Sequence, residues 1–189
     1  PFATIQPNVG VVEVPDERID NIAALFNPKK IIRTTFEFTD IAGLVKGASK
    51  GEGLGNKFLS NIRMTDAIVH VVRCFDDGNI THVEGSVDPI RDIEIINLEL
   101  ALADLQTVEN RLTKVERKAQ AKDKEAAAEY AVLSKLVEAL REGKAARSVE
   151  LTKEEALTAK SYQLLTAKPM IYVANMSEDE IADPENNAY

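Results

Sequence analysis

The sequence predicts an α/β fold, in which a doubly wound sheet carries an inserted helical hairpin. Short apolar runs typical of strands alternate with segments of helical periodicity at both ends of the chain. Between them, residues 90–166 contain no proline and a single glycine, Gly143. We therefore expect residues 1–89 to form the first part of the α/β domain, residues 90–145 to form the hairpin, and residues 146–189 to return to the α/β domain.

The first elements read as a strand, a helix and a second strand. Val9–Val14 and Ile31–Thr39 are the strands. Asp16 can cap the intervening helix because its carboxylate accepts hydrogen bonds from first-turn amides, and Asn27-Pro28 should end it. We expect the apolar residues of this helix to face the core: Ile19, Ile22, Ala23, Leu25 and Phe26.

The next elements predict the central part of a parallel sheet. A helix is expected over Asn56–Met64, and the nearly continuous apolar run Ala67–Phe75 is typical of a strand buried on both faces. Met170–Ala174 reads as a second such strand. Within these runs we expect His70 to be a core histidine with its hydrogen bonds satisfied, and Cys74 to be a core residue.

The hairpin is predicted from apolar residues spaced three and four apart in two segments. The first comprises Leu98, Leu102, Leu105, Val108, Leu112 and Val115, and the second Ala126, Tyr130, Leu133, Val137 and Leu140. The charged gap at 122–125 holds no strong helix breaker, so one uninterrupted helix is the alternative. Gly143 should end the second segment, and Thr152 with Glu155 predicts a capping box at the next helix.

Composition and charge limit the partners. The net charge of −8 predicts no general attraction to nucleic acid, and we expect no DNA partner. Without a membrane-length apolar run or a signal peptide, and with one cysteine, the sequence predicts a cytoplasmic protein with no membrane partner. The hairpin tip is locally basic: Arg111, Lys114, Arg117, Lys118, Lys122 and Lys124. It is either a solvated helix face or a contact for RNA phosphates or an acidic partner.

Residues 40–55 hold the most informative motif. Asp40 ends a predicted strand, Gly43 follows at the third position, and four more glycines occur by residue 55. Nucleotide-hydrolysing domains use this order, because the strand presents a carboxylate to Mg²⁺ and the glycine amide faces the terminal phosphate. The alternative is a turn that merely ends the strand. The glycine cluster favours a phosphate-responsive switch, since so many glycines cost conformational entropy on folding.

Four segments, taken in order, resemble the YchF/Obg-like ATPase family of P-loop proteins. They are residues 1–10, 40–56, 70–75 and 81–89, and the similarity continues to about residue 183. The resemblance implies a P-loop NTPase-like fold. It also implies a Mg²⁺-dependent, nucleotide-hydrolysing switch of the translation-factor class, with the ribosome or ribosomal RNA as a partner.

The resemblance also implies roles for individual residues. Thr4 and Asp40 match the metal-binding positions, and Gly43 matches the amide that contacts the γ-phosphate. Leu44 stands where many GTPases keep a glutamine that orients water, so catalysis must come from elsewhere. The family's candidate is His82, whose imidazole can accept a proton near neutral pH; the alternative is a loop histidine bonded to the backbone.

A second motif concerns the base. Asn175, Met176 and Glu178 follow the last predicted strand and resemble the family's Asn-x-x-Glu pattern, which accompanies a preference for ATP over GTP. An Obg-type GTPase is one alternative, and a non-catalytic adaptor acting through the hairpin is the other. The resemblance places a phosphate-binding loop before Pro1 and a TGS domain after Tyr189, so we expect this chain alone to bind and hydrolyse nucleotide poorly.

Overall fold

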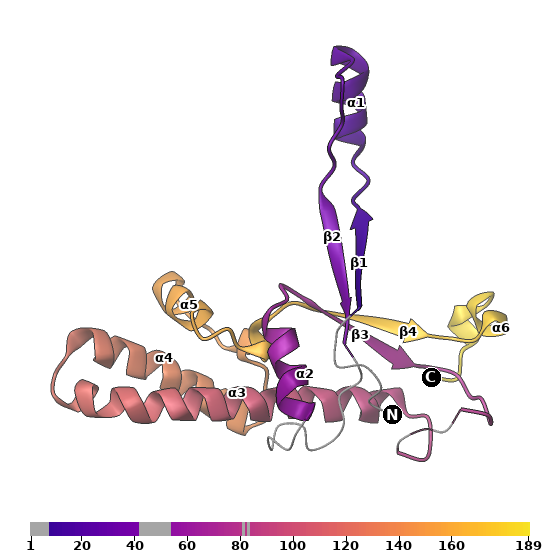
Figure 1. The fold of residues 1–189 in the computed structure, drawn as a ribbon. Coiled ribbons are helices and arrows are strands. Elements are labelled where there is room, and N and C mark those ends of the chain that lie inside the picture. Colours follow the sequence, from indigo (N-terminus) through magenta and orange to yellow (C-terminus); the bar gives the residue numbers. More distant parts are fainter. Residues whose placement is uncertain (1–7, 42–53, 81, 83) are drawn as a thin grey trace. The chain divides into compact units, whose positions relative to one another are not determined.

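The computed structural model describes residues 8–41, 54–80, 82 and 84–189 (Figure 1). The chain divides into two compact units, residues 1–43 and 44–189, and each is described by itself. Together they contain small sheets and long helices, as expected of the predicted α/β class.

The first unit is an antiparallel pair of strands with a helix between them. Strand β1 (Asn8–Glu13) pairs with β2 (Thr35–Asp40), and Asn8 lies opposite Asp40. Helix α1 (Glu17–Phe26) begins where Asp16 accepts a hydrogen bond from the Arg18 amide, as predicted. Asn27 ends it in the left-handed conformation, with its amide donating to the carbonyl of Ala23.

The prediction that the apolar side of α1 faces a core is wrong. The side chains of Ile22, Leu25 and Phe26 are 58%, 81% and 78% exposed. A two-stranded ribbon offers no second layer against which they can pack. The second strand is also shorter than predicted, because the ladder with β1 begins only at Thr35.

The second unit contains a parallel pair. Helix α2 (Leu54–Arg63) precedes β3 (Ile68–Arg73), which pairs with β4 (Met170–Asn175) from Ile68 opposite Met170 to Arg73 opposite Asn175. The prediction of burial on both faces is wrong for β3, since Val69 and Val71 are exposed and only Val72 is fully buried. The same prediction is wrong for β4, in which Ile171, Tyr172 and Val173 are exposed. Among the described residues each strand pairs with the other alone, so no flanking strand or helix layer covers both faces.

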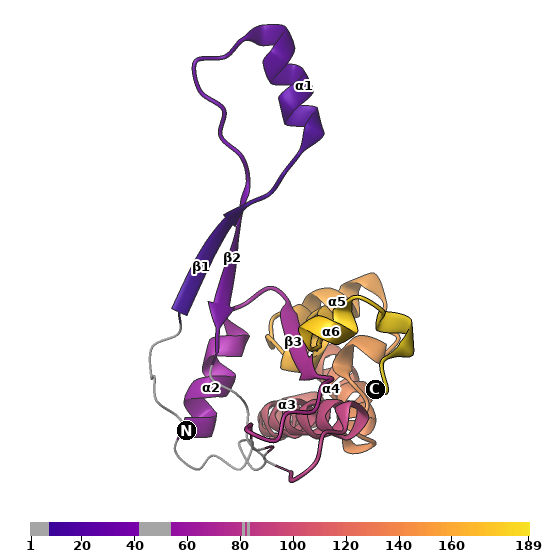
Figure 2. The same ribbon diagram turned by 90° about the vertical axis from the view of Figure 1, so that its right-hand side faces the viewer.

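The insertion consists of two helices, not one. Helix α3 (Pro89–Gln120) and helix α4 (Lys124–Arg141) lie side by side and antiparallel (Figures 1 and 2). Lys122 reverses the chain with a φ of 64°, and Asp123 caps α4 by accepting from the Glu125 and Ala126 amides. The reversal therefore comes from an ordinary lysine and a capping aspartate rather than from glycine or proline.

The main core lies within the hairpin. Val108, Val115, Leu133, Leu136 and Leu140 are buried there and form one cluster. Two leucines of the first apolar repeat, Leu98 and Leu102, lie outside this core, since they are 51% and 38% exposed. Helix α4 has 18 residues against 32 in α3, so the first half of α3 has no α4 beside it.

That half of α3 packs instead on β3 and on the short 3-10 turn η3 (Leu165–Ala167). Its buried residues there are Glu99, Leu100, Ala101, Ala103 and Asp104. The return to β4 also includes the 3-10 turn η2 (Ala146–Ser148) and helix α5 (Lys153–Lys160). The capping box predicted at Thr152 and Glu155 is confirmed by reciprocal hydrogen bonds of 3.2 and 2.9 Å. The chain continues beyond β4 through α6 (Glu178–Ile181) and the 3-10 turn η4 (Pro184–Asn186).

Candidate functional site

Asp40 is the last residue of β2 and its side chain is exposed. Within the described residues, no ion pair engages its carboxylate. The strand therefore carries an exposed acid at its carboxyl end, immediately before the glycine-rich stretch. Thr4, Gly43 and Leu44 lie outside the described residues, so their predicted roles stay predictions.

The second unit assembles its candidate residues at one edge of the sheet. Because β3 and β4 are parallel, the segments that follow them emerge at the same end, and Figure 1 shows α6 and the loop after β3 there. One segment carries His82 and the other carries Asn175, Met176 and Glu178. In open α/β sheets, the carboxyl ends of the strands are where ligands bind.

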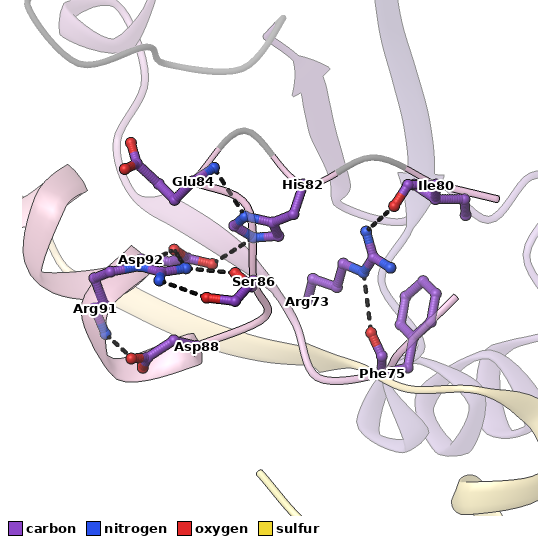
Figure 3. Close-up of polar contacts among 9 residues, drawn as sticks. All are labelled: Arg73, Phe75, Ile80, His82, Glu84, Ser86, Asp88, Arg91 and Asp92. Atoms are coloured by element: carbon purple, nitrogen blue, oxygen red, sulfur yellow. Dashed lines mark hydrogen bonds and ion pairs between the residues drawn. The ribbon is translucent and has the colours of Figure 1, made fainter. Parts of the chain in front are cut away.

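Arg73 shapes the loop that follows β3. Its guanidinium donates to the carbonyls of Phe75 (3.0 Å), Asp77 (3.4 Å) and Ile80 (3.1 Å) and lies 4.6 Å from the Phe75 ring centroid. One planar group therefore satisfies three loop carbonyls and fixes the path of the chain toward His82, as Figure 3 shows for Phe75 and Ile80.

His82 uses both ring nitrogens. Nε2 lies 2.9 Å from Oδ2 of Asp92, and Nδ1 accepts a hydrogen bond of 3.1 Å from the Glu84 amide (Figure 3). Gly85 closes the turn with a φ of 81°, and its amide donates to the His82 carbonyl. The ring is thus tied both to its own turn and to α3. The backbone contact of the alternative interpretation is present, together with a carboxylate contact that it did not include.

The first turn of α3 supplies that carboxylate. Asp92 contacts His82 through Oδ2, while Arg91 donates to Oδ1 at 3.2 and 3.3 Å. Arg91 also reaches back to the Ser86 hydroxyl and carbonyl, and Asp88 caps the helix through the Arg91 amide. The histidine loop and the start of the hairpin therefore form one bonded cluster.

His70 departs from its predicted role. It sits on β3 opposite Tyr172, with ring centroids 5.7 Å apart, but its buried Nδ1 has no hydrogen-bond partner among the described residues. The prediction of a satisfied core histidine is therefore wrong. Desolvation lowers the pKa of His70, against the opposing effect of the Asp92 charge, so burial favours the neutral ring. Cys74 is buried as predicted, and burial raises the pKa of its thiol, which disfavours the reactive thiolate.

The segment after β4 is held by local caps. Ser177 precedes α6, and both its amide and its hydroxyl donate to the Glu180 carboxylate, at 3.2 and 2.6 Å. The carbonyl of Asn175 accepts from the Cys74 amide at 2.8 Å, which links the two strand ends. Because Glu180 does the capping, the exposed Glu178 carboxylate is left to face solvent or a ligand.

A magnesium ion fits the donors that this chain offers. Mg²⁺ prefers oxygen ligands and is commonly held by one or two carboxylates together with substrate phosphates. Asp40 is an exposed carboxylate of that kind. Within the described part of the chain, no cluster of three His, Cys, Asp or Glu residues could bind a metal without such a partner.

The hairpin tip is only partly neutralised. Arg111 is paired with Glu129 at 2.7 Å, and Tyr162 also donates to Glu129. Burial raises the pKa of Tyr162 to about 12, so the phenol stays protonated and neutral at physiological pH. The other five basic residues are exposed and form no ion pair within the described residues. Also within these residues, no helix is long and apolar enough to cross a membrane.

Comparison with known proteins identifies the family and the type of fold. A family described as "50S ribosome-binding GTPase" matches residues 1–135. The chain belongs to this family. It is 64% identical over 187 residues to the ribosome-binding ATPase YchF of Bacillus subtilis (strain 168), covering 99% of this chain and 51% of that protein. It is 53% identical over 189 residues to YchF of Escherichia coli O157:H7, covering 100% of this chain and 51% of the relative.

A solved structure gives the same result for the fold. The YchF GTPase of Schizosaccharomyces pombe is similar with a TM-score of 0.79 and 43% identity, over 100% of this chain and 51% of that one. The predicted family and the P-loop GTPase type of fold are thereby confirmed. The chain spans about half the length of the curated YchF relatives it matches.

Two residues of this region were missed by sequence reasoning. Asp92 carries only a weak signal, an acid in the first turn after the Asp88-Pro89 helix start. The sequence signal at Asp104 is stronger, because this residue is the one carboxylate in the otherwise apolar run Leu100–Leu105. In both cases the partner lies on another element, so the sequence could flag the carboxylate but could not identify what it contacts.

Proposed function

We propose that this chain is the switch-bearing part of a Mg²⁺-dependent, ribosome-associated protein that hydrolyses ATP in preference to GTP. The observation that supports this most strongly is the assembly of the His82 loop and the Asn175–Glu178 segment at the carboxyl edge of one parallel pair, in a chain of the ribosome-binding GTPase family. The YchF relatives carry the names ribosome-binding ATPase and GTPase. We propose that residues 1–89 and 146–189 belong to the nucleotide-binding domain and residues 90–145 to the inserted hairpin.

Each candidate residue then has a chemical role. Asp40 and Thr4 hold the metal, which when bound neutralises charge on the phosphate oxygens. Gly43 donates its amide to the γ-phosphate, and Leu44 stands at the position of the GTPase glutamine but cannot hydrogen-bond the attacking water. His82 accepts a proton from that water. On the other strand, Asn175 braces the loop, Met176 packs beside the base, and Glu178 disfavours guanine.

Base preference supplies the test. Glu178→Asp with Met176→Lys would create the guanine-reading pattern of GTPases, so we expect the ratio of kcat/KM for ATP to that for GTP to fall at least about tenfold in the full-length protein, a change of roughly 1.4 kcal/mol. Steady-state hydrolysis of both nucleotides measures it. Asp179→Glu, an acid-for-acid change at the next position of α6, is the matched control and should leave the ratio unchanged. An unchanged ratio in the double variant would assign base reading to other residues.

The adaptor alternative is favoured by one observation, the concentration of the buried core in the hairpin beneath a basic tip in which, among the described residues, Arg111 alone has an ion-pair partner. It predicts ribosome binding that is independent of nucleotide. It would replace the proposed function if the full-length protein bound ribosomes equally well with and without ATP and showed no hydrolysis above background in their presence.

A further inference from the structure

We propose that Asp92 is the positioning residue of this site, because it fixes the His82 imidazole in the tautomer whose Nδ1 accepts the proton of the attacking water. This inference rests on the proposed function of His82. It identifies Nδ1 as the atom that accepts the proton, Asp92 as the residue that selects this tautomer, and α3 as the helix that carries Asp92.

The hydrogen-bond partners define the tautomer independently on each side. The Glu84 amide can only donate, so Nδ1 must carry a lone pair. The Asp92 carboxylate accepts, so Nε2 must carry the hydrogen. In the opposite tautomer two N–H groups would face each other at Nδ1, and a nitrogen lone pair would face a carboxylate at Nε2.

The two contacts differ in how easily they open. The contact to Asp92 is charge-assisted, 2.9 Å long and partly buried, whereas the contact to the Glu84 amide joins neutral groups, is 3.1 Å long and is exposed. Water can replace the amide at small cost, because an exposed amide finds solvent as its new partner. Nδ1 is therefore the nitrogen that becomes available, while Nε2 stays bound.

The carboxylate is fixed more firmly than the histidine. Asp92 belongs to the capped first turn of α3, its amide donates to the Asp88 carbonyl, and Arg91 holds its second oxygen. His82 belongs to a loop. An acid held in a capped helix that orients an imidazole on a neighbouring loop is the arrangement of a catalytic triad, here with the ring nitrogens exchanged.

The proton and electrons balance in the resulting step. As the water oxygen bonds to the γ-phosphorus, its proton passes to Nδ1, and the bond from phosphorus to the bridging oxygen breaks with its electron pair on ADP. The imidazolium that forms keeps its Nε2–H on Asp92, which stabilises the new charge. Release of the Nδ1 proton to solvent restores the ring.

The ring nitrogens of the full-length protein give the test. In the wild type, ¹⁵N chemical shifts should show His82 as the Nε2–H tautomer. In Asp92→Asn, the side-chain amide can donate to Nε2, so we expect the Nδ1–H tautomer to appear and kcat for ATP to fall at least about tenfold, with KM changed less than about twofold. Glu94→Gln is the matched control, because it removes the same charge two residues further along α3, from an exposed side chain outside the histidine cluster. It should leave both the tautomer and kcat as in the wild type.

The outcomes separate this inference from the proposed function. A wild-type His82 in the Nδ1–H tautomer would overturn the inference whether or not the variant folds. So would an Asp92→Asn enzyme of normal kcat when His82→Ala is inactive. If His82→Ala retains the wild-type kcat, the proposed catalytic role of His82 fails, and the ¹⁵N shifts alone then decide whether Asp92 selects the tautomer.

Discussion

Asp104 links α3 to the backbone of the turn that precedes β4. Its carboxylate is completely buried and accepts hydrogen bonds from the amides of Leu165 (2.8 Å) and Thr166 (2.7 Å) and from the Thr166 hydroxyl (2.7 Å). The Thr166 hydroxyl oxygen in turn accepts from the Ala146 amide at 2.9 Å. One acid of α3 thus satisfies the backbone of the turn that leads into β4, and through Thr166 it reaches η2.

Replacement of Asp104 by Asn should destabilise this unit strongly. An amide has one acceptor oxygen, so its NH₂ group would face either the Leu165 amide or the Thr166 amide and leave a buried donor without a partner. We expect a decrease of about 2–4 kcal/mol in the free energy of unfolding, measured by urea denaturation. Asp77→Asn provides the control, since that half-buried carboxylate accepts, among the described residues, from the Asn79 amide alone, and an asparagine oxygen can replace that acceptor, so it should change stability by less than about 0.5 kcal/mol.

Asp104 also predicts how the stability of this unit depends on pH. Burial raises the pKa of Asp104 in the folded state, although its hydrogen bonds and Arg63, 4.0 Å away, oppose this. A raised folded-state pKa means that stability is greatest below the unfolded value of about 4 and decreases as pH rises through the folded value. The stability advantage of the wild type over Asp104→Asn should therefore shrink as pH rises from about 4. An advantage that grows instead would mean that the hydrogen bonds dominate over burial.

At the scale of elements, the hairpin shows what periodicity can and cannot predict. The two apolar repeats correctly predicted two long helical segments and the burial of Val108, Val115, Leu133 and Leu140. They could not distinguish these residues from the exposed Leu98 and Leu102, because periodicity shows which residues share a face but not whether a neighbour covers it. The predictions of burial for the apolar side of α1 and for the second face of β3 were wrong for the same reason.

Leucines predicted alike from the sequence should therefore behave differently. Leu133→Ala removes a completely buried side chain and should cost about 2–5 kcal/mol of unfolding free energy. Leu98→Ala removes one that is 51% exposed and should cost well under about 1 kcal/mol, which chemical denaturation of both variants would measure. Equal costs would mean that the exposed side of α3 is covered in solution.

The candidate site was predictable only in part. The sequence identified His82, Asn175 and Glu178 from their resemblance to a family, and the parallel pairing of β3 and β4 places their segments at one edge. It did not identify Asp92, ten residues along the chain from His82. That contact requires the loop to fold back onto α3, which depends on the Arg91–Ser86 bonds and the Gly85 turn together. Single-sequence patterns do not encode such cooperative closures.

At the scale of the whole molecule, a net charge of −8 coexists with a basic hairpin tip. If the tip binds ribosomal RNA, the contact must act locally, because the overall field repels phosphate and salt screens charges beyond about 8 Å at physiological ionic strength. Five exposed cations without ion pairs among the described residues, Lys114, Arg117, Lys118, Lys122 and Lys124, provide such a local surface. The acidic remainder of the chain would then disfavour binding in other orientations.

Charge removal at matched sites tests this. In the full-length protein, Lys114→Gln with Lys118→Gln should weaken ribosome binding and reduce the slope of log K against log salt concentration by about 0.7–0.9 for each phosphate that the variant no longer neutralises. Lys153→Gln with Lys160→Gln removes the same charge from α5 and should leave that slope unchanged. Sedimentation with ribosomes over a series of salt concentrations measures both. If the two double variants weaken binding equally, net charge rather than the tip governs the association, and the tip is a solvated helix face.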